Sequence, residues 1–256
     1  MDYDGNEHPV PNAPGYRFRA YPSVGSTNAL AMETARAGDP GGLWIIGAEQ
    51  TAGRARRGRA WTSEKGNFYA SLLLIDPGPS ERVGELPMVA AVALADAVEK
   101  ACGVIGVVKL KWPNDLLIEG RKISGILLEA LTLEEGRRAI VCGFGVNCAH
   151  HPDLGLYPAG DLAGFGFRVT PEMVFLRVAN TISERLEAWS YPGGFAKIRT
   201  DWLHRAVGLG ERINVRYPDR EIAGVFLGLE MDGRLRLRLD NGEIDRISAG
   251  DVFFGE

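Results

Sequence analysis

The sequence predicts a mixed α and β protein with a small all-β unit at its C-terminus. Before Gly208, segments with strand patterning are interspersed with segments of helical spacing. After Glu211 the strands become short and are separated by Pro218-Asp219, Asp232-Gly233 and Asn241-Gly242. Pairs of the Asp-Gly and Asn-Gly kind are typical of hairpin turns. We therefore expect one larger α/β domain followed by a β-barrel or half-barrel, with the boundary near Gly208–Gly210.

The order of elements follows from apolar spacing and from helix caps. Tyr16–Val24 predicts a strand, and the helix after it is capped by Ser26 or Thr27 and stopped by Gly38. Further strands are expected at 43–49, 67–75, 107–112, 115–118, 122–131, 139–146, 212–216, 221–229, 234–239 and 243–247, and helices at 86–101, 171–189 and 194–207. These elements predict a flexible tail at 1–15, a larger α/β domain at 16–208 and a C-terminal domain at 209–256.

Composition and charge exclude several classes of protein. The 256 residues hold 29 Lys+Arg against 33 Asp+Glu, a net charge of -4, which argues against a general nucleic-acid or membrane-surface binder. Three cysteines cannot pair completely, which favours a reducing compartment. We find neither a secretory signal nor an apolar stretch long enough for a membrane span. A cytoplasmic protein is expected.

Positive charge is concentrated in one loop between two predicted strands. Gly53–Arg59 holds four arginines although the chain as a whole is acidic. Guanidinium groups bind phosphate or carboxylate in bidentate geometry, and the glycines let the backbone close over a ligand. No Gly-Lys-Ser/Thr follows, so the pattern is not a P-loop. We interpret the segment as an anion clamp; the alternative is a solvated basic loop.

A second group of candidate residues lies around Lys111–Asp115. Pro113 is expected to end a strand, after which Asn114 and Asp115 offer an amide and a carboxylate that could hold a metal-bound phosphate. A plain turn is the alternative. Lys122 begins an apolar strand and either directs its ammonium at a phosphoryl group or extends into water. Spacing alone does not decide between these interpretations.

Two further patterns are weak. Gly143–Asn147 resembles half of a dinucleotide-binding fingerprint, but no third glycine opens a helix. Glycines in such a strand are expected to mark a bulge or a close approach of the backbone. Cys142, Cys148, His150 and His151 lack a second ligand pair at zinc spacing, so we expect structural or incidental roles for them.

Taken together and in order, these segments resemble the biotin protein ligase family, the biotin–[acetyl-CoA-carboxylase] ligases. The resemblance rests on Ser26–Asn28, Glu49–Thr51, Gly53–Arg59 with Trp61, Lys111–Asp115, Lys122–Glu129 and Gly143–Asn147. It extends from about Tyr16 through the C-terminal strands. It implies a mixed-sheet catalytic domain of the biotin/lipoate ligase type followed by an SH3-like barrel.

The resemblance also implies a reaction and a set of site residues. Biotin and ATP give biotinyl-5′-AMP and pyrophosphate, and the biotinyl group then passes to one lysine of a carboxylase's biotin carboxyl carrier domain. Lys122, Arg56 and Asp115 are expected to be catalytic, with Asp115 also beside Mg²⁺. The expected binding residues for biotin and the nucleotide are Ser26, Thr27, Asn28, Gln50, Gly53, Arg54, Ala55, Arg56, Arg59, Trp61, Asn114, Lys122, Gly125 and Asn147.

The sequence departs from the family pattern at two places. Ala55 stands where relatives often have glycine, and its methyl group is expected to stiffen the loop and to be awkward at a positive φ. The strand predicted from Tyr16 leaves no room for the N-terminal helix-turn-helix of some relatives, so we expect no DNA binding. Some relatives dimerise through their sheets, and the sequence leaves the oligomeric state open.

Two other functions remain as alternatives. A lipoate ligase would have a similar fold, but the arginine loop and Lys111–Asp115 favour biotin. A non-catalytic adenylate-binding regulator would also retain Arg54, Arg56 and Lys122. The carboxylase served and the role of the C-terminal barrel also stay open.

Overall fold

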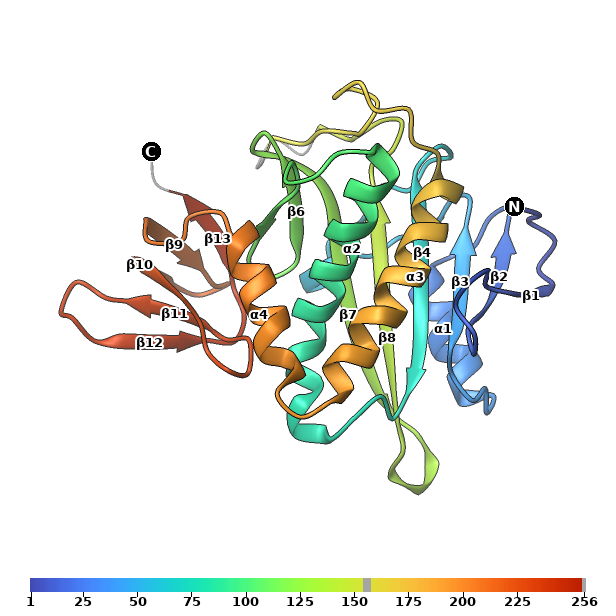
Figure 1. Ribbon diagram of the computed structural model, residues 1–256, viewed down its shortest axis with the longest axis horizontal. Helices are drawn as coiled ribbons and strands as arrows, with labels where there is room; N and C mark the ends of the chain where they lie inside the picture. Colours follow the sequence, from blue (N-terminus) through green and yellow to red (C-terminus); the bar gives the residue numbers. More distant parts are fainter. Residues whose placement is uncertain (154–157, 255–256) are drawn as a thin grey trace.

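The computed structural model describes residues 1–153 and 158–254 and contains two β-sheets (Figure 1). The larger sheet has eight strands in the order β1-β2-β3-β4-β8-β7-β6-β5. They are β1 (Glu7–Pro9), β2 (Arg17–Tyr21), β3 (Leu43–Gly47), β4 (Phe68–Ile75), β5 (Lys109–Lys111), β6 (Asp115–Ile118), β7 (Arg121–Thr132) and β8 (Arg138–Val146). Because β2 and β3 run parallel and the other neighbours antiparallel, the sheet is mixed, as predicted.

Helices cover both faces of the larger sheet because its strands are apolar on both sides. On one face, Trp44 and Ile46 join the main core with α2 (Leu86–Cys102), α3 (Pro171–Ser190) and α4 (Gly194–Arg205). On the other face, Leu43 and Ile45 pack against α1 (Thr27–Arg36). The Ser26 side chain accepts a hydrogen bond from the Ala29 amide at 3.4 Å, which confirms the predicted N-cap.

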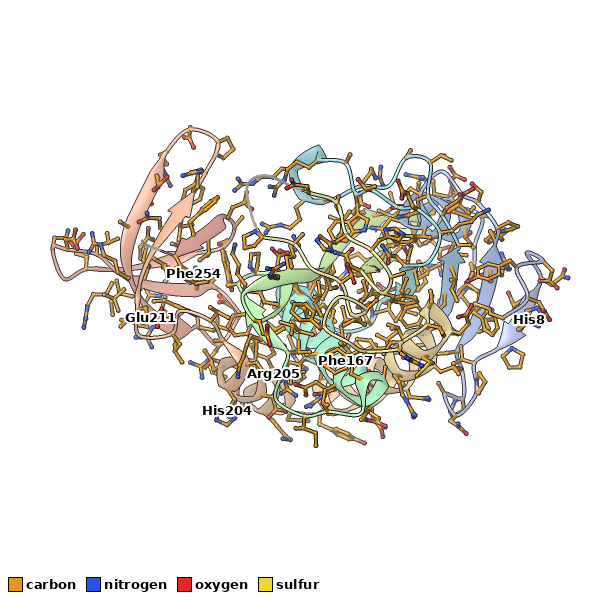
Figure 2. All side chains as sticks on the ribbon, turned by 90° about the horizontal axis from the view of Figure 1, so that it is seen from above. His8, Phe167, His204, Arg205, Glu211 and Phe254 are labelled. Atoms are coloured by element: carbon orange, nitrogen blue, oxygen red, sulfur yellow. The ribbon has the colours of Figure 1, made fainter. Side chains whose placement is uncertain are left out.

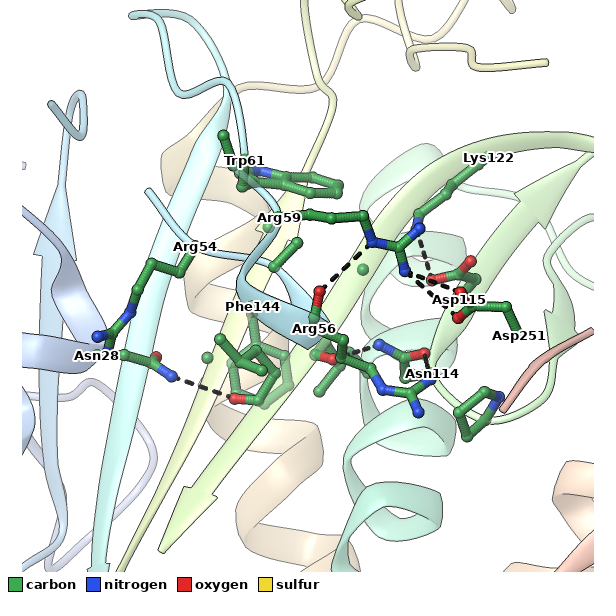
Figure 3. Close-up of a pocket in the computed structure, with 18 of the residues that line it drawn as sticks. Asn28, Arg54, Arg56, Arg59, Trp61, Asn114, Asp115, Lys122, Phe144 and Asp251 are labelled. Atoms are coloured by element: carbon green, nitrogen blue, oxygen red, sulfur yellow. Dashed lines mark hydrogen bonds and ion pairs between the residues drawn. The ribbon is translucent and has the colours of Figure 1, made fainter. Parts of the chain in front are cut away.

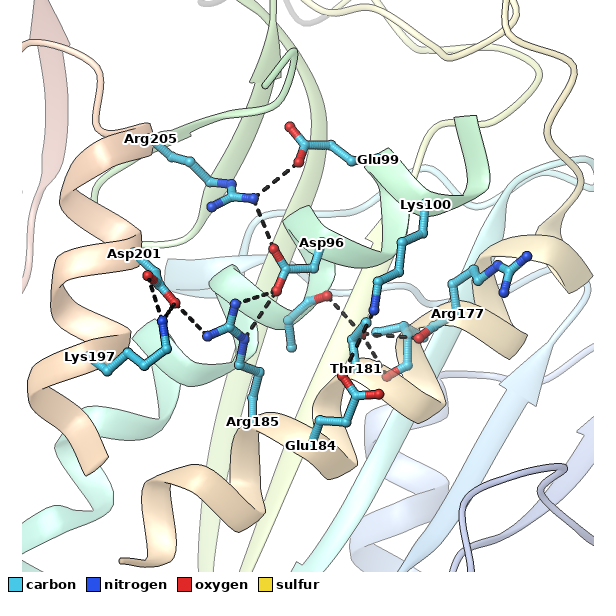
Figure 4. Close-up of polar contacts among 12 residues, drawn as sticks. Asp96, Glu99, Lys100, Arg177, Thr181, Glu184, Arg185, Lys197, Asp201 and Arg205 are labelled. Carbon is cyan, nitrogen blue, oxygen red and sulfur yellow. Dashed lines mark hydrogen bonds and ion pairs between the residues drawn. The ribbon is translucent and has the colours of Figure 1, made fainter. Parts of the chain in front are cut away.

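A cluster of ion pairs joins the three helices on the main-core face (Figure 4). Arg185 of α3 donates to Asp96 of α2 at 2.6 Å and to Asp201 of α4 at 2.5 Å. Arg205 of α4 donates to Asp96 at 2.9 Å and to Glu99 of α2 at 3.0 Å. Since each arginine bridges two carboxylates, the cluster fixes the packing of α3 and α4 against α2.

The second sheet is antiparallel and has the strand order β12-β11-β10-β9-β13. Its strands are β9 (Arg212–Arg216), β10 (Glu221–Leu229), β11 (Leu235–Arg238), β12 (Ile244–Ile247) and β13 (Asp251–Phe254). Figure 2 shows this sheet at the end of the molecule opposite His8. Phe226 packs edge-on against Trp202 of α4, with ring centroids 6.5 Å apart. The apolar core therefore continues across the predicted boundary near Gly208–Gly210, and residues 255–256 of the predicted C-terminal domain lie outside the described part.

The N-terminal residues differ from the loose tail expected at 1–15. β1 pairs with β2 in an antiparallel register, and Val10 and Ala13 are buried. The sequence analysis also missed β13, which pairs with β9. β1 has only three residues, and β13 pairs with a strand that is distant in the chain, so local patterning gives little sign of either. Among the described residues, no helix is both long and apolar enough to cross a bilayer.

Replacing Arg185 with methionine should destabilise the fold by about 2 kcal/mol near neutral pH, between the effects of exposed and buried ion pairs. The variant leaves Asp96 and Asp201 facing each other without their shared cation. Arg212→Met, which removes an exposed pair with Asp240, should change stability little. Denaturant unfolding measures both variants, and equal losses would contradict the role of the cluster.

The effect of Arg185→Met should shrink in acid. Burial raises the pKa of Asp201, but hydrogen bonds and ion pairs with Arg185 and Lys197 outweigh it, so that pKa lies below its usual value. A carboxyl with a lowered folded-state pKa stabilises the protein above its unfolded pKa, and this stabilisation is lost as the pH falls through the folded-state pKa. Unfolding curves recorded down through this range should therefore converge for the two proteins.

Candidate active site

A cavity of about 150 Å³ lies on the α1 face of the larger sheet, beyond the start of α1 (Figure 3). The strand register explains its position. Val141 packs toward α1, so Gly143 and Gly145, two and four residues further along β8, lie on the same face. Their partners on β7 are Leu127 and Gly125. α1 begins over Gly143, and the loop after β3 covers the sheet at Gly145.

The two glycines of β8 let other groups lie directly on the sheet. A Cβ atom at Gly143 would stand 2.2 Å from Oδ1 of Asn28, and one at Gly145 would stand 2.7 Å from Nε1 of Trp61. Any side chain there would displace the start of α1 or the indole ring. The predicted close approach of the backbone at Gly143–Asn147 is therefore confirmed at both glycines.

One end of the cavity carries neutral hydrogen-bonding groups. Gln50 accepts hydrogen bonds through Oε1 from the amide and hydroxyl of Thr27, at 2.9 and 3.0 Å. The Gln50 amide nitrogen donates to Ser63 at 2.9 Å. The side chains of Ser26 and Asn28 complete this end, as the sequence analysis predicted.

The opposite end is strongly basic. Lys122 Nζ lies 2.7 Å from Asp115 Oδ1 and 5.6 Å from the centre of the Trp61 ring. Arg56 donates to Asn114 Oδ1 at 3.1 Å and to the Gly250 carbonyl at 3.4 Å. Figure 3 shows Asn28 at one end and Asp115 with Lys122 at the other. The predicted clamp and the two lysine segments therefore meet in one pocket.

Burial perturbs two of the cations at this end. It lowers the pKa of Lys111, although the neighbouring Asp115 acts in the opposite direction. Burial also lowers the pKa of Arg56, against the opposing effect of Asp251 and Asp115. Cations held with incomplete hydration attract an anion more strongly than exposed ones do, because less water competes for them.

The arginine loop is anchored to the C-terminal sheet. Arg57 and Arg59 each place a guanidinium nitrogen 3.2 Å from Asp251 of β13. The left-handed residues of the loop are Arg57, with φ 58°, and Gly58, with φ 68°. Ala55 is extended at φ -112°, so the difficulty expected for a methyl group at positive φ does not arise.

Two of the predicted binding residues do not line this cavity. Gly53 lies on the outer side of the loop, where a Cβ would stand 2.4 Å from the Trp61 carbonyl. Asn147 is buried behind β8 and donates to the Gly160 carbonyl at 3.0 Å. All the other predicted site residues line the cavity. Both exceptions shape the backbone near the site.

The cysteine and histidine residues set aside in the sequence analysis lie outside the cavity. Burial raises the pKa of Cys142 and of Cys148 to about 12. The His150 ring contacts the Lys65 carbonyl at 2.9 Å, and His151 Nδ1 lies 2.5 Å from Asp161. These contacts hold local structure.

Part of the lining was not among the individually predicted site residues. The additional residues are Ala60, Lys111, Trp112, Pro113, Ile126, Leu127, Gly143, Phe144, Gly145, Asp251 and Val252. The sequence did contain a signal for Gly143 and Gly145, since glycine inside an apolar strand indicates that another group approaches the backbone closely. Asp251 had none, because it belongs to a strand that was itself missed and lies far from the arginine loop in the chain.

The donor set fits a magnesium ion that arrives with a nucleotide. Mg²⁺ prefers oxygen ligands and is commonly held by one or two carboxylates together with substrate phosphates and water. Asp115 supplies a carboxylate and Asn114 an amide oxygen at the basic end of the cavity. Across residues 1–153 and 158–254, no group of three or more acidic, histidine or cysteine side chains could hold a metal alone. Phosphate oxygens would have to complete the coordination.

Comparison with known proteins gives two family matches. Residues 21–147 match the model of the Biotin/lipoate A/B protein ligase family, and residues 208–255 match that of the Biotin protein ligase C terminal domain. The first match includes the predicted site residues from Ser26 to Asn147. The second includes Asp251.

Individual relatives agree with these matches. The chain is 41% identical to a biotin–[acetyl-CoA-carboxylase] ligase of Paracoccus denitrificans, over 90% of this chain and 97% of the relative. It is 31% identical to the bifunctional ligase/repressor BirA of Bacillus subtilis, over 91% of this chain and 72% of the relative. Among solved structures, the biotin protein ligase of Aquifex aeolicus in complex with biotin and ATP superposes with a TM-score of 0.75 at 28% identity, covering 90% of this chain and 95% of that one. The chain therefore belongs to the biotin protein ligase family.

Proposed function

We propose that the protein is an ATP-dependent biotin–[acetyl-CoA-carboxylase] ligase. It joins biotin to ATP to form biotinyl-5′-AMP and pyrophosphate, and then transfers biotin to a lysine of a biotin carboxyl carrier domain. The observation that carries this proposal is the order of chemistry along one cavity. One end holds neutral hydrogen-bonding groups together with Arg54, whose charge is paired with Glu129. Glycines and an indole lie in the middle, and the cations Lys111, Lys122 and Arg56 lie at the other end.

This order matches the chemistry of biotin. Its ureido ring needs neutral hydrogen-bonding partners, and Ser26, Thr27 and Gln50 supply them. Its apolar ring and chain fit against the glycine-lined sheet beneath Trp61. Its carboxylate would then lie near Lys122, where the carboxylate and the phosphates of ATP are both attracted.

In the first step, a carboxylate oxygen of biotin attacks the α-phosphorus of ATP, and pyrophosphate leaves. Two anions must approach each other, so charge has to be neutralised before the reacting atoms can align. Lys122 and Arg56 carry out this neutralisation, and Asp115 holds the Lys122 ammonium in place at 2.7 Å. Mg²⁺, when bound with ATP, would neutralise further phosphate charge.

In the second step, the neutral amine of the carrier lysine attacks the carbonyl carbon of the mixed anhydride. AMP leaves, an amide bond forms, and the amine loses a proton. Asp115 lines the cavity beside Lys122 and could orient that amine or accept its proton. The arginine loop excludes water from the anhydride until the carrier arrives.

The loop also has to move during the cycle. The cavity of about 150 Å³ is small for a site that takes a nucleotide, since ligand pockets commonly measure about 300–1,000 Å³. Arg56 fills part of it by reaching Asn114 and the Gly250 carbonyl. ATP entry therefore requires Arg56 to swing outward and to close again on the adenylate.

Mass spectrometry of the purified protein with Mg²⁺-ATP and either biotin or lipoate tests the reaction. We expect biotinyl-AMP and pyrophosphate with biotin and, after a biotin carboxyl carrier domain is added, one covalent biotinyl adduct on that domain. A lipoyl adduct alone would identify a lipoate ligase instead. ATP binding without an adduct from either acid would indicate a non-catalytic regulator.

Replacing Arg56 with glycine should release biotinyl-AMP about tenfold faster, because a charge-assisted contact across the cavity is lost. Released adenylate would then label exposed lysines of unrelated proteins. Arg56→Lys is the matched comparison: it keeps a cation at the same position without the backbone freedom of glycine, and it should release the adenylate more slowly than Arg56→Gly does. Rapid dilution of preformed adenylate gives both rates, and an unchanged rate in Arg56→Gly would contradict the clamp.

Replacing Asp115 with asparagine should lower the adenylation rate about 100-fold, the effect typical of losing one preorganised electrostatic group. Transfer from preformed biotinyl-AMP to the carrier should slow as well. Glu119→Gln, at the exposed end of the same hairpin, should leave both rates unchanged. Single-turnover assays separate the two steps. Transfer that stays intact while adenylation falls would remove Asp115 from the second step.

A further inference from the structure

Glu129 stands out as a charged residue on the site face of the sheet that the proposed mechanism leaves without a role. It lies on β7, paired with Val141 of β8, whose side chain packs toward α1. Neighbours paired across antiparallel strands share a face. Glu129 therefore faces α1 and the arginine loop, just outside the set of residues that line the cavity.

The Glu129 carboxylate contacts two parts of the site at once. Oε2 accepts a hydrogen bond from Nδ2 of Asn28 at 2.8 Å, at the start of α1. The same carboxylate accepts from Nη2 of Arg54 at 3.0 and 3.2 Å, where the arginine loop begins. The Glu129 side chain is 29% exposed and that of Arg54 is 45% exposed. The pair is thus partly shielded, and it connects the arginine loop to the start of α1.

The contact with Asn28 sets the direction of a hydrogen-bond chain. A carboxylate accepts only, as does the Leu127 carbonyl 3.3 Å from the same amide nitrogen. Asn28 must therefore direct its NH₂ group toward them and its Oδ1 toward Ser71. The Ser71 hydroxyl lies 2.5 Å from that Oδ1 and donates its one hydrogen there.

The direction continues to the lining of the cavity. Ser71 Oγ also lies 2.7 Å from Thr27 Oγ1. The Thr27 hydroxyl donates its own hydrogen to Oε1 of Gln50 at 3.0 Å. The Thr27 hydroxyl therefore donates its one hydrogen to a protein group. Its lone pairs face the cavity, where the oxygen can accept a hydrogen bond from a ligand N–H group. The ureido ring of biotin carries such N–H groups.

We propose that Glu129 is a positioning residue that fixes the donor–acceptor pattern of the ureido end of the cavity and fastens the arginine loop to it. This inference rests on the proposed function. With a neutral amide at 129, Asn28 could turn over and Ser71 could donate toward Thr27. Arg54 would lose its anion, and the loop would lose its attachment on the α1 side.

Steady-state kinetics and calorimetric biotin binding test this with Glu129→Gln, Arg54→Met and the double variant. We expect Glu129→Gln to raise KM for biotin, and its Kd measured without ATP, about tenfold, the effect of losing hydrogen bonds to a charged group. KM should rise more than kcat falls, because Glu129 contacts no reacting atom. The double variant should be no worse than the more severe single variant, since both remove one shared contact.

Glu7→Gln is the matched control. Glu7 also bridges two arginines, Arg17 at 2.9 Å and Arg19 at 2.8 Å, but at the far edge of the same sheet. It should leave KM and Kd for biotin unchanged. A structural role for Glu129 alone would lower the melting temperature without raising KM, and that result would overturn the proposal.

Two further outcomes would overturn the proposal: an unchanged KM in Glu129→Gln, or effects of Glu129→Gln and Arg54→Met that simply add. The formation of biotinyl-AMP by the wild-type protein distinguishes failure of the proposed ligase function from failure of the proposed role of Glu129. Wild-type protein that forms no biotinyl-AMP would refute the ligase itself. If the wild-type protein forms biotinyl-AMP and the Glu129→Gln variant binds biotin with normal affinity, only the role of Glu129 would be refuted.

Discussion

The site depends on two strand positions that carry no side chain. Gly143 and Gly145 of β8 allow Asn28 and Trp61 to lie directly against the sheet, at distances that a Cβ atom would forbid. Strand β8 is the centre of the larger sheet's pairing, between β4 and β7. The start of α1, the indole wall and the floor of the cavity are therefore positioned by the most constrained strand of the fold, and the mobile loop is left to supply charge.

That charge is balanced at both ends of the loop. Arg54 forms an ion pair with Glu129 on β7, whereas Arg57 and Arg59 form ion pairs with Asp251 on β13. Arg56 lies between these anchors and donates to an amide oxygen and a backbone carbonyl. Neutral acceptors hold a guanidinium less strongly than carboxylates do. The loop thus keeps its outer arginines paired and leaves Arg56 available to exchange those contacts for a phosphate.

The sequence predicted most of the fold because its strands and helices are locally consistent in patterning and caps. α1, capped at Ser26, and the hairpins β10–β11 and β11–β12, with turns at Asp232-Gly233 and Asn241-Gly242, were expected from cap and turn residues alone. β1 was missed because it has only three residues, and β13 because its partner β9 is distant in the chain. The site was anticipated where motifs are contiguous, as in Lys111–Asp115. Asp251 and the role of Glu129 depend on tertiary contacts that local patterning does not reveal.

The two carboxylates that anchor the arginine loop, Asp251 and Glu129, attach it to different parts of the molecule. Asp251 belongs to the C-terminal sheet, which shares its core with α4, so its pairs tie the loop to a separate layer of the molecule. Glu129 belongs to the sheet that forms the cavity floor, and its pair ties the loop to the ligand's own binding surface. Partly exposed ion pairs contribute only about 0.2–1 kcal/mol each, so no single pair holds the loop permanently closed. A bound adenylate that adds its own anionic contacts to Arg56 therefore has enough free energy to determine whether the loop is open or closed.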